Sequence, residues 1–424
     1  MGFVLSLTAI AYLDRVCISA AKPAMKEALG LSDIQMGYAF SAFTFAYALF
    51  EVPSGWLADR FGPRLMLTRI VVWWSLMTAL TGAASGFASL VVVRLLFGIG
   101  EAGMFPGLAR AFAAWIPGRS HGAVFGLSIT AALMSGALTQ KLVVGLLGVM
   151  SWRWTFPMFG AVGMVWAVGW YRWFRNDPAA HPGLNVAERE ALGREREAAG
   201  EASRGSVPWA RMLRSRSLGA LCVVYFGIIY GWYFYLTWMP DYLQRAHGLS
   251  KDAAASYSAL PLVAMAVAVL GGGYWSDALC RRWGLRRGRR ALGLVSLPLA
   301  ALAVSGAAWV RSGPAAALLL SLAAGLASLS VGSAWAATLD LGGRHAGVVS
   351  GAMNMLGNLG GALSPVVVGH CVERWSRSDA WFAWHAPILS TAAGYLLSFG
   401  CWMLIDAGTP LFGEAPAGPR TDRQ

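Results

Sequence analysis

Apolar segments separated by short polar connections run along the whole chain. Twelve of them are about 20 residues or longer, which is enough for an α-helix to cross a bilayer. The expected spans are residues 2–22, 36–58, 65–86, 88–112, 122–148, 154–175, 216–244, 254–279, 290–311, 314–339, 345–372 and 383–407. The pattern therefore predicts an all-α membrane protein with twelve transmembrane helices.

The longest polar interruption falls between the sixth and seventh spans. It contains a mixed-charge run, for which we expect a short amphipathic helix. The interruption divides the chain into a six-helix bundle at residues 1–175, a linker at 176–215 and a second bundle at 216–410, followed by a tail at 411–424. Two six-helix halves of this kind are typical of secondary transporters.

The composition supports a membrane protein. The chain is 57% hydrophobic and 13% charged, about half the charged fraction of an ordinary soluble domain. Its net charge of +13 comes from arginines in the connections on the side of the linker, which places the linker and both termini in the cytoplasm. We therefore expect a multi-pass protein of a bacterial inner membrane, with no nucleic-acid partner.

Signatures of enzymes and cofactor sites are missing from the sequence. It contains no P-loop, no zinc-protease motif and no cysteine pair at metal-binding spacing, and its five cysteines are dispersed. We expect no cofactor, no metal and no enzymatic activity, and nothing in the pattern predicts an obligate oligomer, so the expected state is a monomer.

Two charged residues stand out within the fourth span. Arg94 and Glu101 are seven residues apart, so on a helix they face the same way, about 10 Å apart along its axis. A charge at this depth normally faces a partner or a water-filled path. We interpret Arg94 as an anion site beside a proton site at Glu101. The alternative is an ion pair that only holds two helices together.

The first span carries a second pair, Asp14 and Arg15. Adjacent side chains on a helix point about 100° apart, so we expect Arg15 to face the centre and Asp14 to face a flanking helix. Arg15, Arg94 and Lys141 lie at similar depths and would attract an organic anion. Lys141 could instead extend to the outer interface. Asp14 and Glu101 are the acids of the first half that we expect to be deep enough to pair with these cations.

Two connections share a pattern of aspartate, glycine and cations. The first, between spans two and three, contains Gly55, Asp59, Arg60, Gly62 and Arg64. The second, between spans eight and nine, contains Asp277 followed by an arginine cluster. An aspartate is stabilised at the N-terminus of a helix, so these residues are predicted to form a conformational latch on the cytoplasmic side. The alternative is a pair of ordinary basic loops.

Several motifs resemble those of a known family. The Gly55–Arg64 loop resembles the signature loop of the major facilitator superfamily. Tyr12-Leu-Asp14-Arg15, the Arg94 to Glu101 run, Thr237-Trp238-Met239-Pro240 and the Asn354 to Asn358 run resemble its anion:cation symporter branch, which includes bacterial galactonate and hexuronate transporters and vesicular glutamate and sialic acid carriers. The resemblance covers both halves of the chain.

The resemblance implies roles for particular residues. It associates Asp14 and Glu101 with proton coupling, Arg15 and Arg94 with the anion, and Tyr47, Trp335 and Asn354 with the substrate in sugar-acid members. Tyr12 is a further candidate for the lining because it lies two residues before Asp14. The chain departs from many sugar-acid members at Ala132, where they carry a glutamine, and this leaves room for other carboxylates.

The expected function is proton-coupled symport of a small organic anion by alternating access. The acids, when ionised, would pair with the arginines, and protonation would free a guanidinium for the carboxylate of the substrate. The alternatives are a Na+-coupled carrier, a uniporter or exchanger of organic anions, a membrane or lipid-modifying enzyme, and a sensor that retains the fold without transporting.

Overall fold

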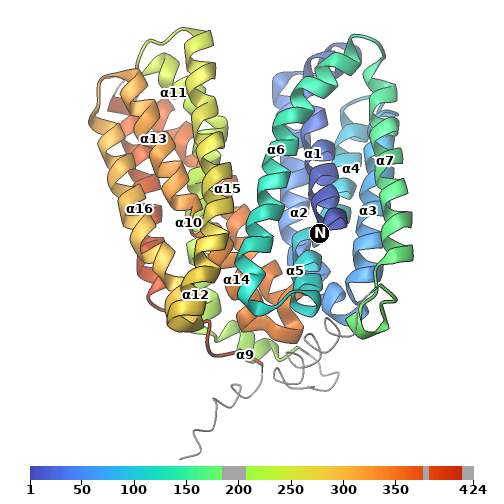
Figure 1. Ribbon diagram of the computed structural model, residues 1–424. Helices are drawn as coiled ribbons and strands as arrows, with labels where there is room; N and C mark the ends of the chain where they lie inside the picture. Colours follow the sequence, from blue (N-terminus) through green and yellow to red (C-terminus); the bar gives the residue numbers. More distant parts are fainter. Residues whose placement is uncertain (184–206, 376–381, 413–424) are drawn as a thin grey trace, which may run out of the picture.

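The computed structural model describes residues 1–183, 207–375 and 382–412, and every regular element among them is helical (Figure 1). The first half contains α1 (Gly2–Leu29), α2 (Asp33–Phe61), α3 (Pro63–Thr81), α4 (Phe87–Glu101), α5 (Met104–Trp115), η1 (Gly118–Ser120), α6 (His121–Leu147), α7 (Trp152–Trp173) and η2 (Pro178–Ala180). The second half contains α9 (Trp209–Leu213), α10 (Arg216–Thr237), α11 (Met239–Arg245), α12 (Lys251–Trp309), α13 (Gly313–Ser328), α14 (Val331–Gly342), η3 (Gly343–His345), α15 (Ala346–Trp375), η4 (Phe382–Trp384) and α16 (His385–Trp402).

These helices form the twelve membrane-length units that the apolar pattern predicts. The fourth, seventh and tenth expected spans are each built from two shorter helices in line, namely α4 with α5, α10 with α11, and α13 with α14. α12 holds the eighth and ninth spans, since Gly284 breaks it with φ 78° and ψ 163°. Within the described residues, five helical stretches are long and apolar enough to cross a membrane by length and composition alone. The mixed-charge run of the linker lies outside the described residues.

Local sequence signals explain where α2 begins and ends. Ser32 and Gln35 form a reciprocal capping box at its N-terminus, with N to Oγ and N to Oε1 distances of 3.1 and 2.9 Å. At its other end Gly62 adopts φ 82° and ψ 154°, a conformation that glycine adopts without steric cost. Pro63 then starts α3, where its missing N–H is not needed. The turn at Gly284 in the second half has nearly the same backbone angles.

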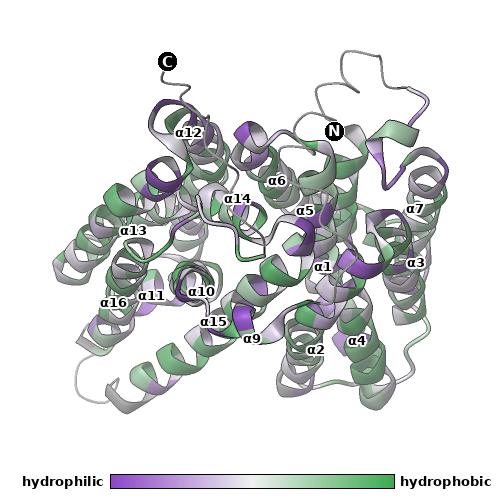
Figure 2. Cartoon of the chain, turned by 90° about the horizontal axis from the view of Figure 1, so that it is seen from below, coloured by the Kyte–Doolittle hydropathy of each residue, from purple (hydrophilic) through white to green (hydrophobic). Residues whose placement is uncertain are grey.

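The two bundles stand side by side and converge at one end (Figure 1). We call this the linker end, because α9 and the ends of α7 and α10 lie there. The bundles pack together mainly through α2 against α15 and α6 against α12, and α5 packs against both α14 and α15. Figure 2 views the molecule from the linker end and shows hydrophilic residues near α5, α9 and α12, with hydrophobic residues along much of the remaining helices.

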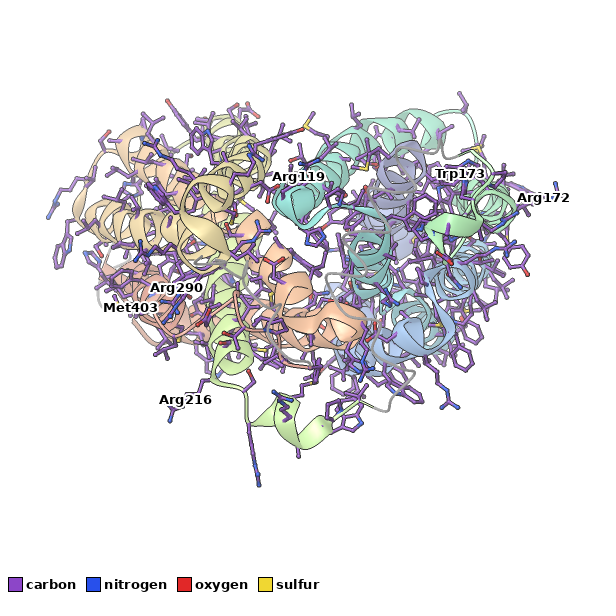
Figure 3. All side chains as sticks on the ribbon, turned by 60° about the horizontal axis from the view of Figure 1, so that its bottom comes forward. Arg119, Arg172, Trp173, Arg216, Arg290 and Met403 are labelled. Atoms are coloured by element: carbon purple, nitrogen blue, oxygen red, sulfur yellow. The ribbon has the colours of Figure 1, made fainter. Side chains whose placement is uncertain are left out.

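The surface of the bundles is apolar where a bilayer would surround it. Large hydrophobic side chains, among them Phe45, Leu138, Val165 and Leu302, are strongly exposed, which a soluble monomer rarely shows over a large area. Arginines are instead found in the connections at the linker end, where Figure 3 labels Arg119, Arg172, Arg216 and Arg290. This separation matches the positive-inside pattern that the sequence predicts.

Candidate functional site

An ion pair joins α1 to the end of α4 inside the first bundle. Arg15 Nε donates to Glu101 Oε1 over 2.5 Å. Glu101 is fully buried, and the Arg15 side chain is 19% exposed. Glu101 is the last residue of α4, because the backbone leaves the helix at Ala102 and Gly103 has φ 87°. The partner of Glu101 is therefore Arg15, from another helix, and not Arg94 of its own helix.

Aromatic rings hold both arginines of the site. The Arg15 guanidinium lies 4.4 Å from the ring centre of Tyr47 and 5.4 Å from that of Phe43. The Arg94 guanidinium lies 4.6 Å from Phe43 and 4.8 Å from Phe97. Each such contact contributes about 0.5–2 kcal/mol. Phe43 is thus shared by the two cations, which brings Arg15 and Arg94 together as the sequence predicts, although Phe43 and Phe97 were not among the predicted site residues.

Arg94 is a buried cation with unused hydrogen-bonding capacity. It is only 3% exposed, and its Nε has no hydrogen-bond partner among the described residues. On the same helix, the backbone at Gly98 approaches the Phe43 carbonyl of α2 so closely that any Cβ there would clash. A guanidinium held in this way can offer a planar pair of N–H groups to a carboxylate.

Asp14 faces a different neighbour of α1 from Arg15, as expected for adjacent residues on a helix. Its side chain is buried and faces Trp74 and Thr78 of α3, without a hydrogen bond of normal geometry to either oxygen. Arg94 is among the charged groups that interact with it. Asp14 is therefore near the cations but separated from the boundary between the bundles.

A third acid, Glu51, lies at that boundary. It is fully buried on α2, and its Oε1 accepts a hydrogen bond of 2.7 Å from Asn354 Nδ2 of α15, which also lies 3.4 Å from the Tyr47 hydroxyl. Asp14 and Glu101 are both buried as expected, but the expectation that they are the only deep acids of the first half is wrong. Glu51 could have been found from its spacing, because it follows Tyr47 by four residues and so shares its face of the helix.

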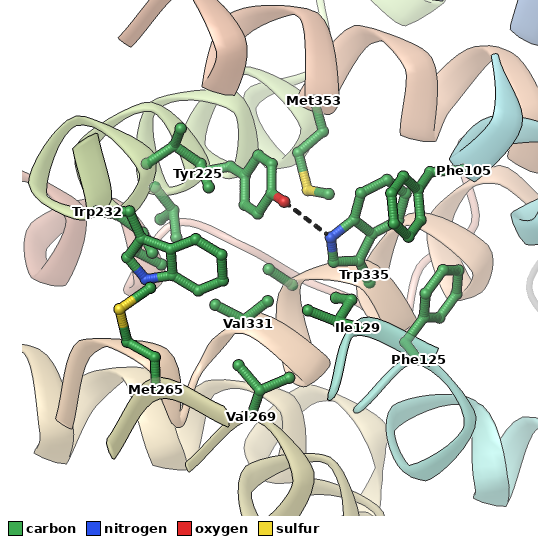
Figure 4. Close-up of a cluster of buried hydrophobic side chains, with 14 of the residues drawn as sticks. Phe105, Phe125, Ile129, Tyr225, Trp232, Met265, Val269, Val331, Trp335 and Met353 are labelled. Atoms are coloured by element: carbon green, nitrogen blue, oxygen red, sulfur yellow. Dashed lines mark hydrogen bonds between the residues drawn. The ribbon is translucent and has the colours of Figure 1, made fainter. Parts of the chain in front are cut away.

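Trp335 lies in the contact between the bundles. Its indole N–H donates to the Tyr225 hydroxyl over 3.1 Å, and its ring packs against Phe105 and Phe125 of the first half (Figure 4). Trp335 is almost fully buried, so in this state it belongs to a hydrophobic cluster that spans both halves. Tyr12 is placed beside Arg15, 5.6 Å from its guanidinium.

The remaining predicted cation of the site, Lys141, has its backbone in α6. Its side chain lies outside the described residues. Its role stays a prediction.

At the linker end, each half caps a helix of the other half. Asp59 at the end of α2 accepts the backbone N–H groups of Gly347 and Val348, 2.9 and 2.8 Å away, in the first turn of α15. Asp277 on α12 accepts the corresponding N–H groups of Gly122 and Ala123 in the first turn of α6, at 3.0 and 2.7 Å. Both carboxylates thus satisfy unpaired amides at the positive end of a helix dipole.

One glycine of the first predicted latch allows this close approach. A Cβ at Gly55 would collide with the carbonyl of Gly347, whereas Gly62 faces the Asn176 side chain of its own half. Gly347 in turn faces the carbonyl of Gly55 and the Asp59 carboxylate. The backbones of α2 and α15 are therefore almost in contact beside the cap.

The cations of the latch differ from those predicted. Arg60 packs over the rings of Trp56 and Phe61, and Arg64 packs over Tyr171 and donates to its carbonyl. Among the described residues, neither forms a hydrogen bond or ion pair with Asp59 or Asp277. The aspartates meet other arginines, which are Arg110, 3.7 Å from Asp59, and Arg289, 2.6 Å from Asp277 and 2.8 Å from Asp340.

Arg60 and Arg64 were predicted to be latch cations because they follow Asp59 in the chain. Their side chains instead pack on aromatic rings of their own bundle, Arg60 from the last turn of α2 and Arg64 from the first turn of α3, and their role in a latch stays a prediction. Arg289 belongs to the arginine cluster that the sequence indicates, but nothing in its spacing singles it out. Arg110 and Asp340 come from other helices, and only the packing brings them to the latch.

Comparisons with known proteins identify the family. A model of the Major Facilitator Superfamily matches residues 4–365. A probable sulfoacetate transporter of Cupriavidus necator is 34% identical to this chain over 98% of this chain and 96% of its own length. The hexuronate transporter of Bacillus subtilis and a D-galactonate transporter of Escherichia coli are each 28% identical, over 97% and 92% of this chain and 94% and 93% of their own lengths.

Solved structures share the fold. The human organic anion transporter MFSD10 superposes with a TM-score of 0.68 at 18% identity, covering 94% of this chain and 99% of its own. The proton:xylose symporter XylE gives the same TM-score at 14% identity, covering 94% of both chains. The predicted all-α fold and the predicted superfamily are both confirmed. The chain belongs to the Major Facilitator Superfamily, as a multi-pass membrane transporter and not an enzyme.

Proposed function

We propose that the protein imports a small organic anion together with protons by alternating access in a bacterial inner membrane. The observation that carries this proposal is the arrangement of two aromatic-packed arginines, of which Arg15 is paired with the buried Glu101 and Arg94 retains an unused Nε. The names of the relatives support an anionic cargo, because sulfoacetate, hexuronate and galactonate all carry a carboxylate.

The Arg15–Glu101 pair provides a coupling mechanism. While Glu101 is ionised it occupies the guanidinium of Arg15, and a buried ion pair is strongly destabilised when only one partner is removed. Protonation of Glu101 releases Arg15, which then needs a new negative partner. A substrate carboxylate supplies it, so that proton and anion bind together although they do not touch each other.

The contacts between the halves at the linker end support a state that is closed there and opens on the opposite side. We propose that this linker end is cytoplasmic, in keeping with its arginines, and that loading of the site allows the two aspartate caps to release. The halves would then separate at α2 and α15 and at α6 and α12, which exposes the site to the cytoplasm.

Uptake into proteoliposomes tests the proposal. The full chain is reconstituted and offered labelled sulfoacetate, galactonate or glucuronate under an inward proton gradient. Accumulation of one of them that is abolished by a protonophore and does not depend on Na+ is expected. Accumulation that requires Na+ at constant pH would support sodium coupling, equilibration without accumulation would support a uniporter, and binding without movement would support a sensor.

Substitution of Glu101 tests the coupling step. Glu101→Gln cannot ionise, so Arg15 is permanently released, and we expect anion exchange between two anion-filled compartments to continue while proton-driven accumulation is lost. Glu27→Gln is the matched control, because Glu27 is an exposed acid at the end of α1. Unchanged accumulation by Glu101→Gln would remove this residue from the proposed mechanism.

A further inference from the structure

Glu51 is a buried acid that the coupling of Arg15 and Glu101 does not use. Its Oε1 accepts from Asn354, while its Oε2 has no hydrogen-bond partner among the described residues. A buried carboxylate with one unsatisfied oxygen is costly when it is ionised. The Glu51 carboxyl group can therefore hold a proton, and it lies at a contact between the two halves.

The titratable groups around Glu51 belong to the site. Tyr47 of its own helix, Arg15 of α1 and Glu101 of α4 all interact with it, and Tyr225 of α10 faces it from the second half. The charge of Glu51 therefore interacts electrostatically with Arg15, the arginine that would bind the anion.

The charges in the site determine how many of its carboxylates must be protonated when a cargo is bound. Arg15 and Arg94 contribute two positive charges, and one negative charge in the cargo leaves one for a protein carboxylate to balance. A cargo with two negative charges neutralises both arginines by itself. Any carboxylate that stayed ionised beside it would then be an uncompensated buried charge, which costs several kcal/mol. A doubly charged anion therefore requires one more proton on the acids than a singly charged anion.

We propose that Glu51 takes up this additional proton, so that a dianionic cargo enters with one more proton than a monoanionic cargo. This inference rests on the proposed function. It requires Glu51 to be the carboxylate that stays ionised beside a monoanionic cargo, whereas Asp14 and Glu101 keep the same protonation state with both cargoes.

The position of Glu51 also provides a route for release of the proton. At Gly351 the backbone of α15 is so close to α2 that a Cβ there would lie 2.8 Å from the Glu51 carbonyl oxygen. Glu51 is eight residues from Asp59, about 12 Å along the helix, so the same separation of α2 and α15 that breaks the cap breaks the bond to Asn354. Water from the linker end then reaches the carboxyl group, and the proton leaves there with the cargo.

The alternative is that Glu51 only positions Asn354. Glu51→Gln separates the two roles, because glutamine keeps an oxygen that can accept from Asn354 but cannot carry a proton. A positioning role predicts that the number of protons is unchanged in this variant. Glu51→Asp, which retains a carboxyl group, is expected to keep the stoichiometry of the wild type.

The pH gradient at which net anion flux reverses, measured in proteoliposomes at zero membrane potential with a fixed anion gradient, gives the number of protons per anion. Sulfoacetate is the dianionic probe, with a sulfonate and a carboxylate, and galactonate is the monoanionic probe. In the wild type we expect one more proton with sulfoacetate than with galactonate, and in Glu51→Gln no difference. Each proton lost lowers the greatest accumulation tenfold for one unit of pH gradient at zero potential, so Glu51→Gln should accumulate sulfoacetate about tenfold less.

The outcomes distinguish this inference from the proposed function. If the wild type accumulates neither anion under a proton gradient, the proposed function itself fails. If it accumulates both with the same number of protons, or if Glu51→Gln retains the stoichiometry of the wild type for sulfoacetate, the proposed function stands and the role of Glu51 is refuted. If the Glu51→Gln chain does not fold, the comparison of the two anions on the wild type can still refute the inference, because equal numbers of protons would leave no additional proton for Glu51 to carry.

Discussion

Replacement of Asp59 by asparagine should open the linker end. The Asp59 carboxylate accepts two N–H groups from the first turn of α15, at 2.9 and 2.8 Å, and its side chain is 4% exposed. Asparagine retains one acceptor oxygen and no charge, and its NH2 group would face the second N–H. The variant therefore loses one charge-assisted hydrogen bond, worth about 1.5–3 kcal/mol, and the attraction of the carboxylate to the helix dipole, worth about 0.3–1 kcal/mol.

The sum sets the size of the shift. A loss of about 2–4 kcal/mol changes the ratio of the closed to the open linker end by a factor of about 30–800, given about 1.4 kcal/mol for each tenfold change. If the wild type is closed in 99 of 100 molecules, a free-energy gap of about 2.7 kcal/mol, Asp59→Asn becomes a mixture in which the open state is common. The same change at Asp277 should act in the same direction, and more strongly, because it also leaves the buried Arg289 with one carboxylate fewer.

Distances between spin labels at the linker end measure this shift. Labels at Arg60 in the first half and Arg282 in the second, both exposed, report on separation of the bundles once the five native cysteines have been replaced. We expect a single short distance in the parent and a second, longer population in Asp59→Asn. Asp241→Asn is the control, since Asp241 is a 43% exposed acid that pairs with Arg245 of its own helix. A distance distribution for Asp59→Asn that matches the control would refute the assignment of Asp59 as a cap that holds the halves together.

Three further predictions test other parts of the site. Gly55→Val should favour the open linker end in the same distance measurement, because its side chain collides with the Gly347 carbonyl; an unchanged distribution would contradict the close packing. Arg94→Gln should weaken anion binding by tenfold or more, in line with about 1.5–3 kcal/mol for a hydrogen bond to a charged group, and calorimetric titration with an affinity like that of the wild type would show that the anion lies elsewhere. Trp335→Phe should lose the bond to Tyr225 and lower the stability of the closed state by about 0.5–1.5 kcal/mol, which a scan of thermal unfolding in detergent can detect; an unfolding midpoint equal to that of the wild type would mean that the bond is not maintained.

The sequence predicts the fold well because one physical quantity dominates it. A helix that crosses a bilayer must be apolar over its whole length, so the twelve spans and the division into halves can be found from hydropathy alone. The breaks within three of these spans are harder to predict. Gly103 does mark the end of α4 by its positive φ, but glycines at Gly98 and Gly100 in the same run serve helix packing, and composition does not separate the two uses.

The site was predicted in part, because spacing along a helix gives a face but not the opposing helix. The sequence predicts correctly that Arg15 and Arg94 lie near each other, and it does not predict that Glu101 pairs with Arg15. Glu51 was missed although its spacing from Tyr47 was available. The partners of Asp59 could not be found by looking for opposite charges, since its two hydrogen bonds come from backbone amides.

The crossed caps at the linker end have a consequence for chimeric proteins. Asp59 and Asp277 recognise main-chain N–H groups, which every residue except proline provides. A half taken from a relative at 28% identity therefore offers the same docking points as the native half, provided that small residues at Gly55 and Gly347 still let the helices approach. Hybrids that join the first bundle of one homologue to the second bundle of another should still close at this end. Their cargo preference depends on side chains from both bundles and would have to be optimised again by substitution.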